Sequence, residues 1–331
     1  IASHTTSQPK DSAAHASASG PTMSLQFGQI KISKGSLTYT DGSTNQTIKI
    51  DPINVTLPGF APGKETSFDI NLTALTNGMT ISLTTSGQAT VADNYQNISL
   101  GHMSTSLSVK GGALADQATV SFKNDTAIDL SSSTLKSTMS DIQINYLDTR
   151  VNGSATATGP FAAPSITFSA SSPHINLDTF SSSSKKSPPS SLGTTASQSS
   201  AAASSPLLPV DLLRALNIGG DIKIDRLTTN QLTVQNVTTK ISAKSGDIKI
   251  TPLNADFYDG KINGNIALNV TGATPHISIK SDLSNINVDK IIKTKMGDDY
   301  ISGVATTNID LTLSGNTLSA FKNNLNGTVK I

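Results

Sequence analysis

Hydrophobic and polar residues alternate along most of this chain. Between Met23 and Phe180 the apolar positions recur at every second residue in short runs. This spacing places the apolar side chains of an extended strand on one face, whereas it would scatter them around a helix. The region is therefore predicted to be a series of β-strands, with the clearest runs at Ile30/Ile32, Leu37/Tyr39, Ile48/Ile50, Ile53/Val55/Leu57, Phe68/Ile70/Leu72, Met79/Ile81/Leu83, Leu107/Val109, Val120/Phe122, Ile128/Leu130 and Ile142/Ile144/Tyr146.

Turn sequences separate several of these runs. Asp41-Gly42, Asn77-Gly78 and Gly111-Gly112 are pairs that accept the positive backbone angles of tight hairpins. Consecutive strands are therefore expected to be antiparallel neighbours, and the same reasoning predicts a hairpin turn at Tyr258-Asp259-Gly260.

The same alternation resumes in the last third of the chain, together with helical spacing in three places. Helices are predicted at Pro206–Leu216, Asp289–Met296 and Thr317–Leu325, where each would cap one end of a sheet. The strand runs are Ile222/Ile224, Leu232/Val234, Ile248/Ile250, Leu253/Ala255/Phe257, Ile262/Gly264/Ile266/Leu268/Val270, Ile277/Ile279 and Ile309/Leu311/Leu313.

Two polar segments divide the chain. Residues 1–22 have no periodic apolar positions and are predicted to be disordered or a linker. Residues 181–205 are a Ser/Ala-rich low-complexity linker, too polar to pack. The predicted organisation is thus a first β-sheet module at 23–180 and a second module, with short helices, at 206–331.

One segment is present twice. Residues 150–180 and 261–291 align without a gap at an offset of 111 (261 − 150 = 111), and Asn152, Gly153 and Asp178 recur as Asn263, Gly264 and Asp289. A shared pattern of turns and inward residues indicates duplicated β units, so a modular, elongated protein is expected.

Composition narrows the functional classes. Charged residues make up 14% and the net charge is +1, which provides no electrostatic basis for binding nucleic acid. The chain has no cysteine, so disulfides and thiolate metal sites are excluded. No apolar stretch reaches the length of a membrane-spanning helix. The chain begins with Ile1, and we interpret it as a fragment whose membrane anchor lies outside it.

Catalytic patterns are not found. The histidines have no partners at metal-ligand spacing, and neither a nucleophile elbow nor a phosphate-binding glycine loop occurs. We therefore expect no enzymatic activity, no catalytic residue, no metal and no cofactor.

The strands are one-sided, with aliphatic residues on one face and Thr, Ser, Asn and Lys on the other. Such a face must be covered by another sheet, by helices or by a ligand, and the few short helices are not enough. A stack of β-sandwiches or a β-solenoid would have a closed core, whereas a curled sheet would leave a trough for lipid. The residues predicted to line such a trough are Ile222, Ile224, Ile262, Ile266, Leu268, Val270, Ile277 and Ile279.

Several segments resemble the AsmA family of Gram-negative envelope proteins. The first module contributes residues 27–41, with a G-x-L-x-Y-x-D turn, and 48–57. The second contributes 212–224, 227–237, 252–264 and 325–329. The resemblance covers about residues 23–331 and rests on the order and spacing of these segments.

This resemblance implies a mainly β protein: an elongated, curled antiparallel β-sheet forming a groove, with a few short helices, similar to chorein-type bridge-like lipid transfer proteins. It also implies a periplasmic protein tethered to the bacterial inner membrane, involved in phospholipid movement and outer-membrane biogenesis.

The leading hypothesis is accordingly a non-enzymatic protein that holds phospholipid acyl chains. The alternative is a secreted or surface β-solenoid of the adhesin type with a closed core. Such proteins are, like this chain, rich in Ser, Thr, Asn and Gly. A polysaccharide enzyme would need clustered carboxylates or aromatic platforms, and neither is visible in the sequence.

Overall fold

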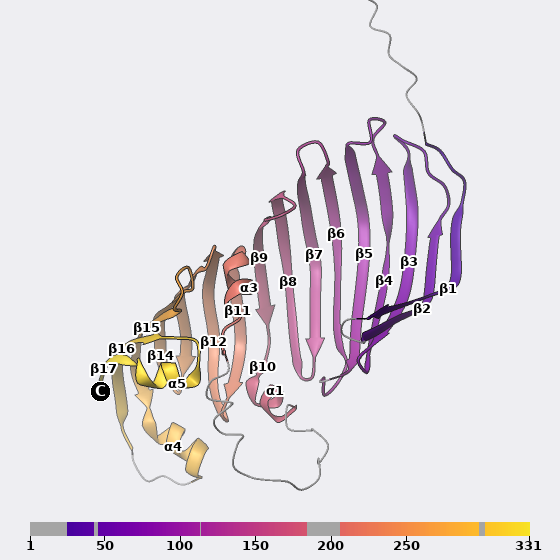
Figure 1. Ribbon diagram of the computed structural model, residues 1–331. Helices are drawn as coiled ribbons and strands as arrows, with labels where there is room; N and C mark the ends of the chain where they lie inside the picture. The colour runs from indigo at the N-terminus through magenta and orange to yellow at the C-terminus, as the bar shows by residue number, and fades with distance from the viewer. Residues whose placement is uncertain (1–24, 43–45, 113, 184–205, 298–301) are drawn as a thin grey trace, which may run out of the picture.

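The structure is a computed structural model that describes residues 25–42, 46–112, 114–183, 206–297 and 302–331. The predicted linker at 1–22 and most of the predicted linker at 181–205 lie outside these ranges. The described residues form one open sheet of 17 strands (Figure 1), so the prediction of a mainly β, elongated antiparallel sheet with a few short helices is confirmed.

The first half of the sheet is a meander in which each strand pairs antiparallel with the next. Asn77 and Gly78, both with positive φ, form the predicted tight turn between β3 and β4. The strands are β1 (Ile30–Asp41), β2 (Gln46–Leu57), β3 (Glu65–Thr76), β4 (Met79–Val91), β5 (Asn97–Gly111), β6 (Ala118–Asp129), β7 (Thr134–Tyr146), β8 (Thr149–Pro160) and β9 (Ser165–Ser172).

The second half is another antiparallel meander, with helices between some of its strands. Its strands are β11 (Asn217–Thr229), β12 (Leu232–Lys244), β13 (Asp247–Phe257), β14 (Gly260–Asn269), β15 (His276–Asn287), β16 (Val304–Ser314) and β17 (Asn326–Lys330). The helices are α3 (Val210–Ala215), α4 (Val288–Met296) and α5 (Leu318–Asn323), which lie inside the three predicted segments to within one residue.

Two parallel pairings join the two halves. Residues 166–172 of β9 pair with residues 218–224 of β11, and the two-residue strand β10 (Ile175–Asn176) pairs with β11 further along. Parallel neighbours need a crossover connection, and here it consists of α1 (Leu177–Ser183), the undescribed segment and α3. The two predicted modules therefore share one sheet.

The duplicated segment is a hairpin followed by a helix. Its first copy forms β8, β9 and α1, and its second forms β14, β15 and α4. The similarity begins one strand earlier, because the β7–β8 register shifts between Met139 and Ile142 and the β13–β14 register shifts between Ile250 and Leu253, again 111 residues apart (250 − 139 = 111).

The recurring glycine of the repeat has a steric role. A Cβ atom built on Gly153 would lie 2.4 Å from the carbonyl oxygen of Ser169, and one built on Gly264 would lie 2.8 Å from that of Lys280. Both distances are shorter than a Cβ atom tolerates, so the hairpin needs glycine at this point in both copies.

We predict that Gly153→Ala lowers the free energy of unfolding by about 1–3 kcal/mol, because the new methyl group overpacks against a backbone carbonyl. Gly219→Ala on β11 is the matched control, since its Cβ would lie 3.8 Å from its nearest neighbour, the carbonyl oxygen of Ile241. Thermal unfolding followed by circular dichroism measures both. Equal melting temperatures for the two variants would contradict this reading of the repeat.

Candidate functional site

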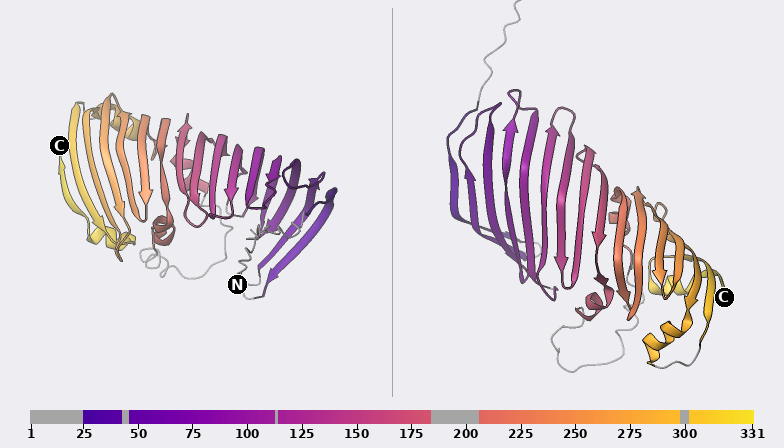
Figure 2. Two further views of the ribbon diagram at one scale, coloured as in Figure 1. Left: turned by 90° about the horizontal axis from the view of Figure 1, so that it is seen from above. Right: turned by 180° about the vertical axis from the view of Figure 1, so that it is seen from behind.

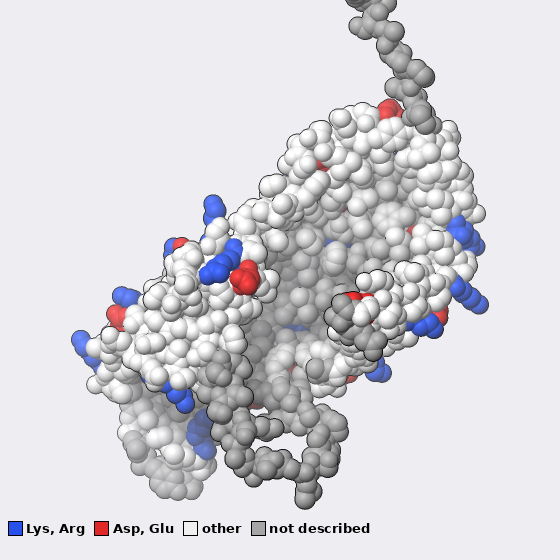
Figure 3. All heavy atoms as spheres, viewed as in Figure 1, with Lys and Arg blue, Asp and Glu red and all other residues white. Residues whose placement is uncertain are grey.

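The curled sheet has a hollow face on which charged side chains are confined to the margins. Figure 2 shows the strands following an arc, and Figure 3 looks into the hollow, where Lys, Arg, Asp and Glu are concentrated at the margins. Charged pairs occupy the opposite face, as in the register pairs Lys240–Asp221 and Lys280–Asp310, each 3.3 Å apart. We call the hollow face the concave face.

The strand register extends this face across the whole sheet, because directly paired residues point to the same side. The register places Asp41, at the end of β1, on the concave side. Toward the end of β11, Arg226 follows Ile222 and Ile224 at every second position. One row of neighbours, from β3 to β8, is Leu72, Leu83, Leu107, Val120, Ile144 and Val151. A row in the second half is Ile241, Ile250, Ile266, Ile279 and Leu311.

Little protein covers the concave face. Among the described residues, the buried apolar side chains are Ala157, Val237, Ala243, Ala255, Val270 and Ile286, and most of these are small. Near the β1 end, Leu37 and Tyr39 are 54% and 60% exposed. A closed sandwich or solenoid core would bury such residues almost completely, so the described part of the chain has an open apolar trough instead.

Seven of the eight predicted trough residues share the concave face and are half-buried. Ile266 pairs with Ile279 and Leu268 with Ile277, while β12 and β13 connect them in register to the two residues on β11. These seven are Ile222, Ile224, Ile262, Ile266, Leu268, Ile277 and Ile279. Val270 differs: it follows β14 and is 0% exposed, so its side chain packs within the rim.

A segment before and including α3, which we call the strap (206–216), runs along one rim of the second half. At one end, Asn316 beyond β16 accepts from the amide of Leu208 (2.7 Å) and donates to its carbonyl (3.1 Å). Further along, Arg214 donates to the carbonyls of Val270 and Gly272, each at 2.7 Å. The strap thus passes the ends of β12–β15 and forms the border of the trough along this rim.

Helix α4 builds up the opposite rim. Lys290 forms an ion pair with Asp259 in the β13–β14 turn (2.7 Å), and Lys295 hydrogen-bonds the carbonyl of Asn230 in the β11–β12 turn. Hydrogen bonds from Lys290 and Asn287 lower the pKa of Asp259 below its ordinary value. The trough is therefore bordered by helices on both rims of its second half.

Helix α1 fastens the junction between the halves at the same rim. The carboxylate of Asp178 accepts from the backbone amides of Asn230 (2.6 Å) and Gln231 (2.8 Å). Asn230 and Gln231 both have positive φ, and the backbone amides of both residues point toward the same carboxylate. The spacing of apolar residues in α1 did not predict a helix. The repeat, however, aligns this segment with α4, which was predicted to be helical.

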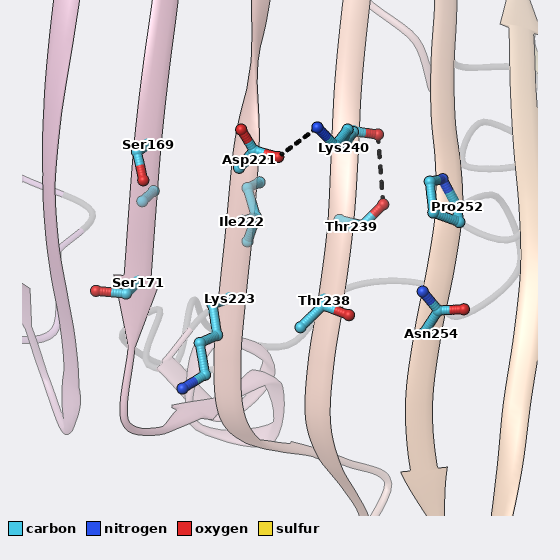
Figure 4. A pocket seen from close by; sticks show the side chains of 11 residues that line it. Ser169, Ser171, Asp221, Ile222, Lys223, Thr238, Thr239, Lys240, Pro252 and Asn254 are labelled. Atoms are coloured by element: carbon cyan, nitrogen blue, oxygen red, sulfur yellow. Dashed lines mark hydrogen bonds and ion pairs between the residues drawn. The ribbon is translucent and has the colours of Figure 1, made fainter.

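The outer face carries a shallow depression of about 390 Å³ over β9, β11, β12 and β13 (Figure 4). Ser169, Ser171, Lys223 and the Asp221–Lys240 ion pair lie around it, and these groups belong to the charged side of the sheet. No group of three or more potential metal ligands occurs among the described residues. We find no arrangement of nucleophile, base and orienting group in the part of the chain that the structure describes.

An open sheet with one apolar trough defines an elongated β-groove protein. A model of the AsmA family matches residues 69–331, and the chain belongs to this family. The family is associated with membrane-anchored bacterial proteins and is not a known enzyme family. Searches of curated proteins and of solved structures found no significant match. None of the described helices is long and apolar enough to cross a membrane.

We predict that Asn316→Ala releases the strap, because two hydrogen bonds to Leu208 are lost. Each is worth about 0.5–1.5 kcal/mol, so hydrogen exchange of the α3 amides should accelerate by about tenfold or more. Asn326→Ala on exposed β17 is the control and should leave these amides unchanged. Unchanged exchange in Asn316→Ala would show that the strap is held in another way.

Proposed function

We propose that this chain is the lipid-holding part of a non-enzymatic lipid-transfer protein that contributes to outer-membrane biogenesis. In this proposal the full-length protein is periplasmic and tethered to the inner membrane by a segment outside this chain. The observation that carries the proposal is the apolar face, which continues in register across the β9–β11 junction.

The size of this face supports a bound apolar ligand. Soluble monomers rarely expose contiguous apolar patches larger than a few hundred Å². At about 4.8 Å between strands, the described sheet extends for roughly 70 Å along its curve. Burying each CH₂ group contributes about 0.8 kcal/mol, so an acyl chain of about sixteen carbons gains roughly 12 kcal/mol.

The charge distribution indicates which part of a phospholipid enters the trough. A phosphate needs cationic or hydrogen-bonding partners when it leaves water, and the cations lie at the margins of the concave face rather than at its centre (Figure 3). The acyl chains therefore occupy the trough, and the headgroup stays at a rim, where Lys290 and Lys295 lie on α4. Rows of similar aliphatic residues bind the acyl chains with similar energy along the sheet. A bound lipid can therefore move along the trough and is not held at a single position.

The β-solenoid alternative agrees less well with the architecture. A solenoid stacks parallel coils around a closed core, whereas the described strands pair antiparallel except where β9 and β10 pair with β11. The antiparallel architecture and the family membership therefore favour a groove over a solenoid.

Leu268→Asp should reduce co-purifying phospholipid by about tenfold or more, because it places a carboxylate beside Ile248 and Ile277 within the trough. Asn269→Asp is the matched control on the neighbouring, outward position, where the side-chain oxygen that accepts from Thr271 is retained.

Lipid extraction and mass spectrometry of both purified variants measure the effect, with circular dichroism to verify folding. Equal phospholipid content in the two folded variants would contradict the proposed face. A folded wild-type chain that carries no phospholipid would contradict the proposed function itself.

A further inference from the structure

Uncharged polar side chains cross the aliphatic concave face in the first half of the sheet. Thr85 on β4 and Thr105 on β5 hydrogen-bond through their hydroxyls, with oxygens 2.9 Å apart. Thr126 on β6 and Ser137 on β7 form a second hydroxyl pair at 2.7 Å. Asn124 donates to Thr126 Oγ1 at 3.1 Å. We call these five residues the polar seam.

The seam lies among apolar neighbours on every strand. Thr105 stands opposite Phe122, and Ser137 stands opposite Ala157 of β8. Thr85 is buried, while the other four are half-buried and reach the open trough. The seam is therefore a polar crossing at mid-height of a surface that is otherwise suited to hydrocarbon.

The hydroxyl pairs have unused donors. Each Ser or Thr hydroxyl carries one hydrogen, and only one of the two hydrogens in a pair is needed for the bond between them. Each pair can thus donate one further hydrogen bond into the trough. Plain hydrocarbon lying on the seam would leave these groups without partners, which is unfavourable.

Building on the proposed function, we propose that the polar seam is a hydrogen-bonding station for the ester carbonyls of a diacyl glycerolipid. An ester carbonyl accepts hydrogen bonds and carries no charge, which matches spare hydroxyl donors on a face whose cations lie at the margins. The two hydroxyl pairs lie four residues apart along β6, or roughly 13 Å at about 3.3 Å per residue, so each pair serves one ester carbonyl at a time.

The station gives the trough a preferred stopping point. Elsewhere a sliding acyl chain meets one aliphatic row after another, so its energy changes little. At the seam, a lipid with ester carbonyls gains hydrogen bonds that a lipid without them lacks. The first half of the sheet therefore discriminates between linkage types, and the second half contributes apolar contact.

The test compares a diester phosphatidylcholine with its diether analogue of equal chain length and headgroup, binding to the whole chain. One hydrogen bond of ordinary strength predicts that wild type prefers the diester by about two- to tenfold. The variant Thr85→Val/Thr105→Val/Thr126→Val/Ser137→Ala removes both hydroxyls of each pair and should bind both lipids with the affinity that wild type has for the diether.

The control Thr138→Val/Thr158→Val changes exposed residues on the outer face of β7 and β8 and should keep the preference. Equal affinities of wild type for the two lipids would overturn the station while leaving the groove intact. A retained preference in the seam variant would also overturn it. Binding of neither lipid would overturn the proposed function together with the station.

Discussion

The pairing of β9 with β11 is the interaction on which the continuity of the trough depends. The chain makes ordinary hairpins on either side of it, and only here does it cross over to a parallel neighbour. The register sets Ile166 beside Ile218 and Ala170 beside Ile222, so the apolar rows continue from one half into the other. A slip of one residue would exchange the faces of the second half.

Helices that lie outside the sheet stabilise the β9–β11 junction. It is short compared with the hairpins around it, and its two strands are not linked by a tight turn. The carboxylate of Asp178 on α1 holds the β11–β12 turn through the amides of Asn230 and Gln231. Helix α4 reaches the same turn through Lys295. Helices from both copies of the repeat thus meet at one rim, and the concave face itself stays largely open.

Most of the local structure could be predicted from the sequence. Alternation identified the strands, glycine and asparagine identified turns such as Asn77-Gly78, and helical spacing identified α3, α4 and α5. The family assignment followed from the order of these segments and is confirmed over residues 69–331. Helix α1 was missed because Ser181 to Ser183 merge into the low-complexity segment, although the repeat aligns it with α4.

Contacts between residues far apart in the chain could not be predicted from the sequence. Alternation shows that Ile222 and Ile266 face one side of their strands, but not that β9 pairs with β11. The strap depends on the contact between Asn316 and Leu208, which no local pattern indicates. Val270 fits the alternation of β14, yet the chain leaves the strand there and buries it. The sequence also contains a second internal similarity, between residues 48–57 and 248–257. In both segments the register with the following strand shifts next to a proline.

The central claim is that one continuous face, in both halves of the sheet, contacts lipid. The most direct measurement is photo-crosslinking in cells with a photoreactive phenylalanine analogue at paired inner and outer positions of three strands. These pairs are Tyr39 and Thr38 on β1, Phe122 and Ser121 on β6, and Leu311 and Thr312 on β16. The account predicts acyl-lipid adducts at Tyr39, Phe122 and Leu311 and none at their neighbours. Adducts on both faces alike, or in only one half of the sheet, would contradict it.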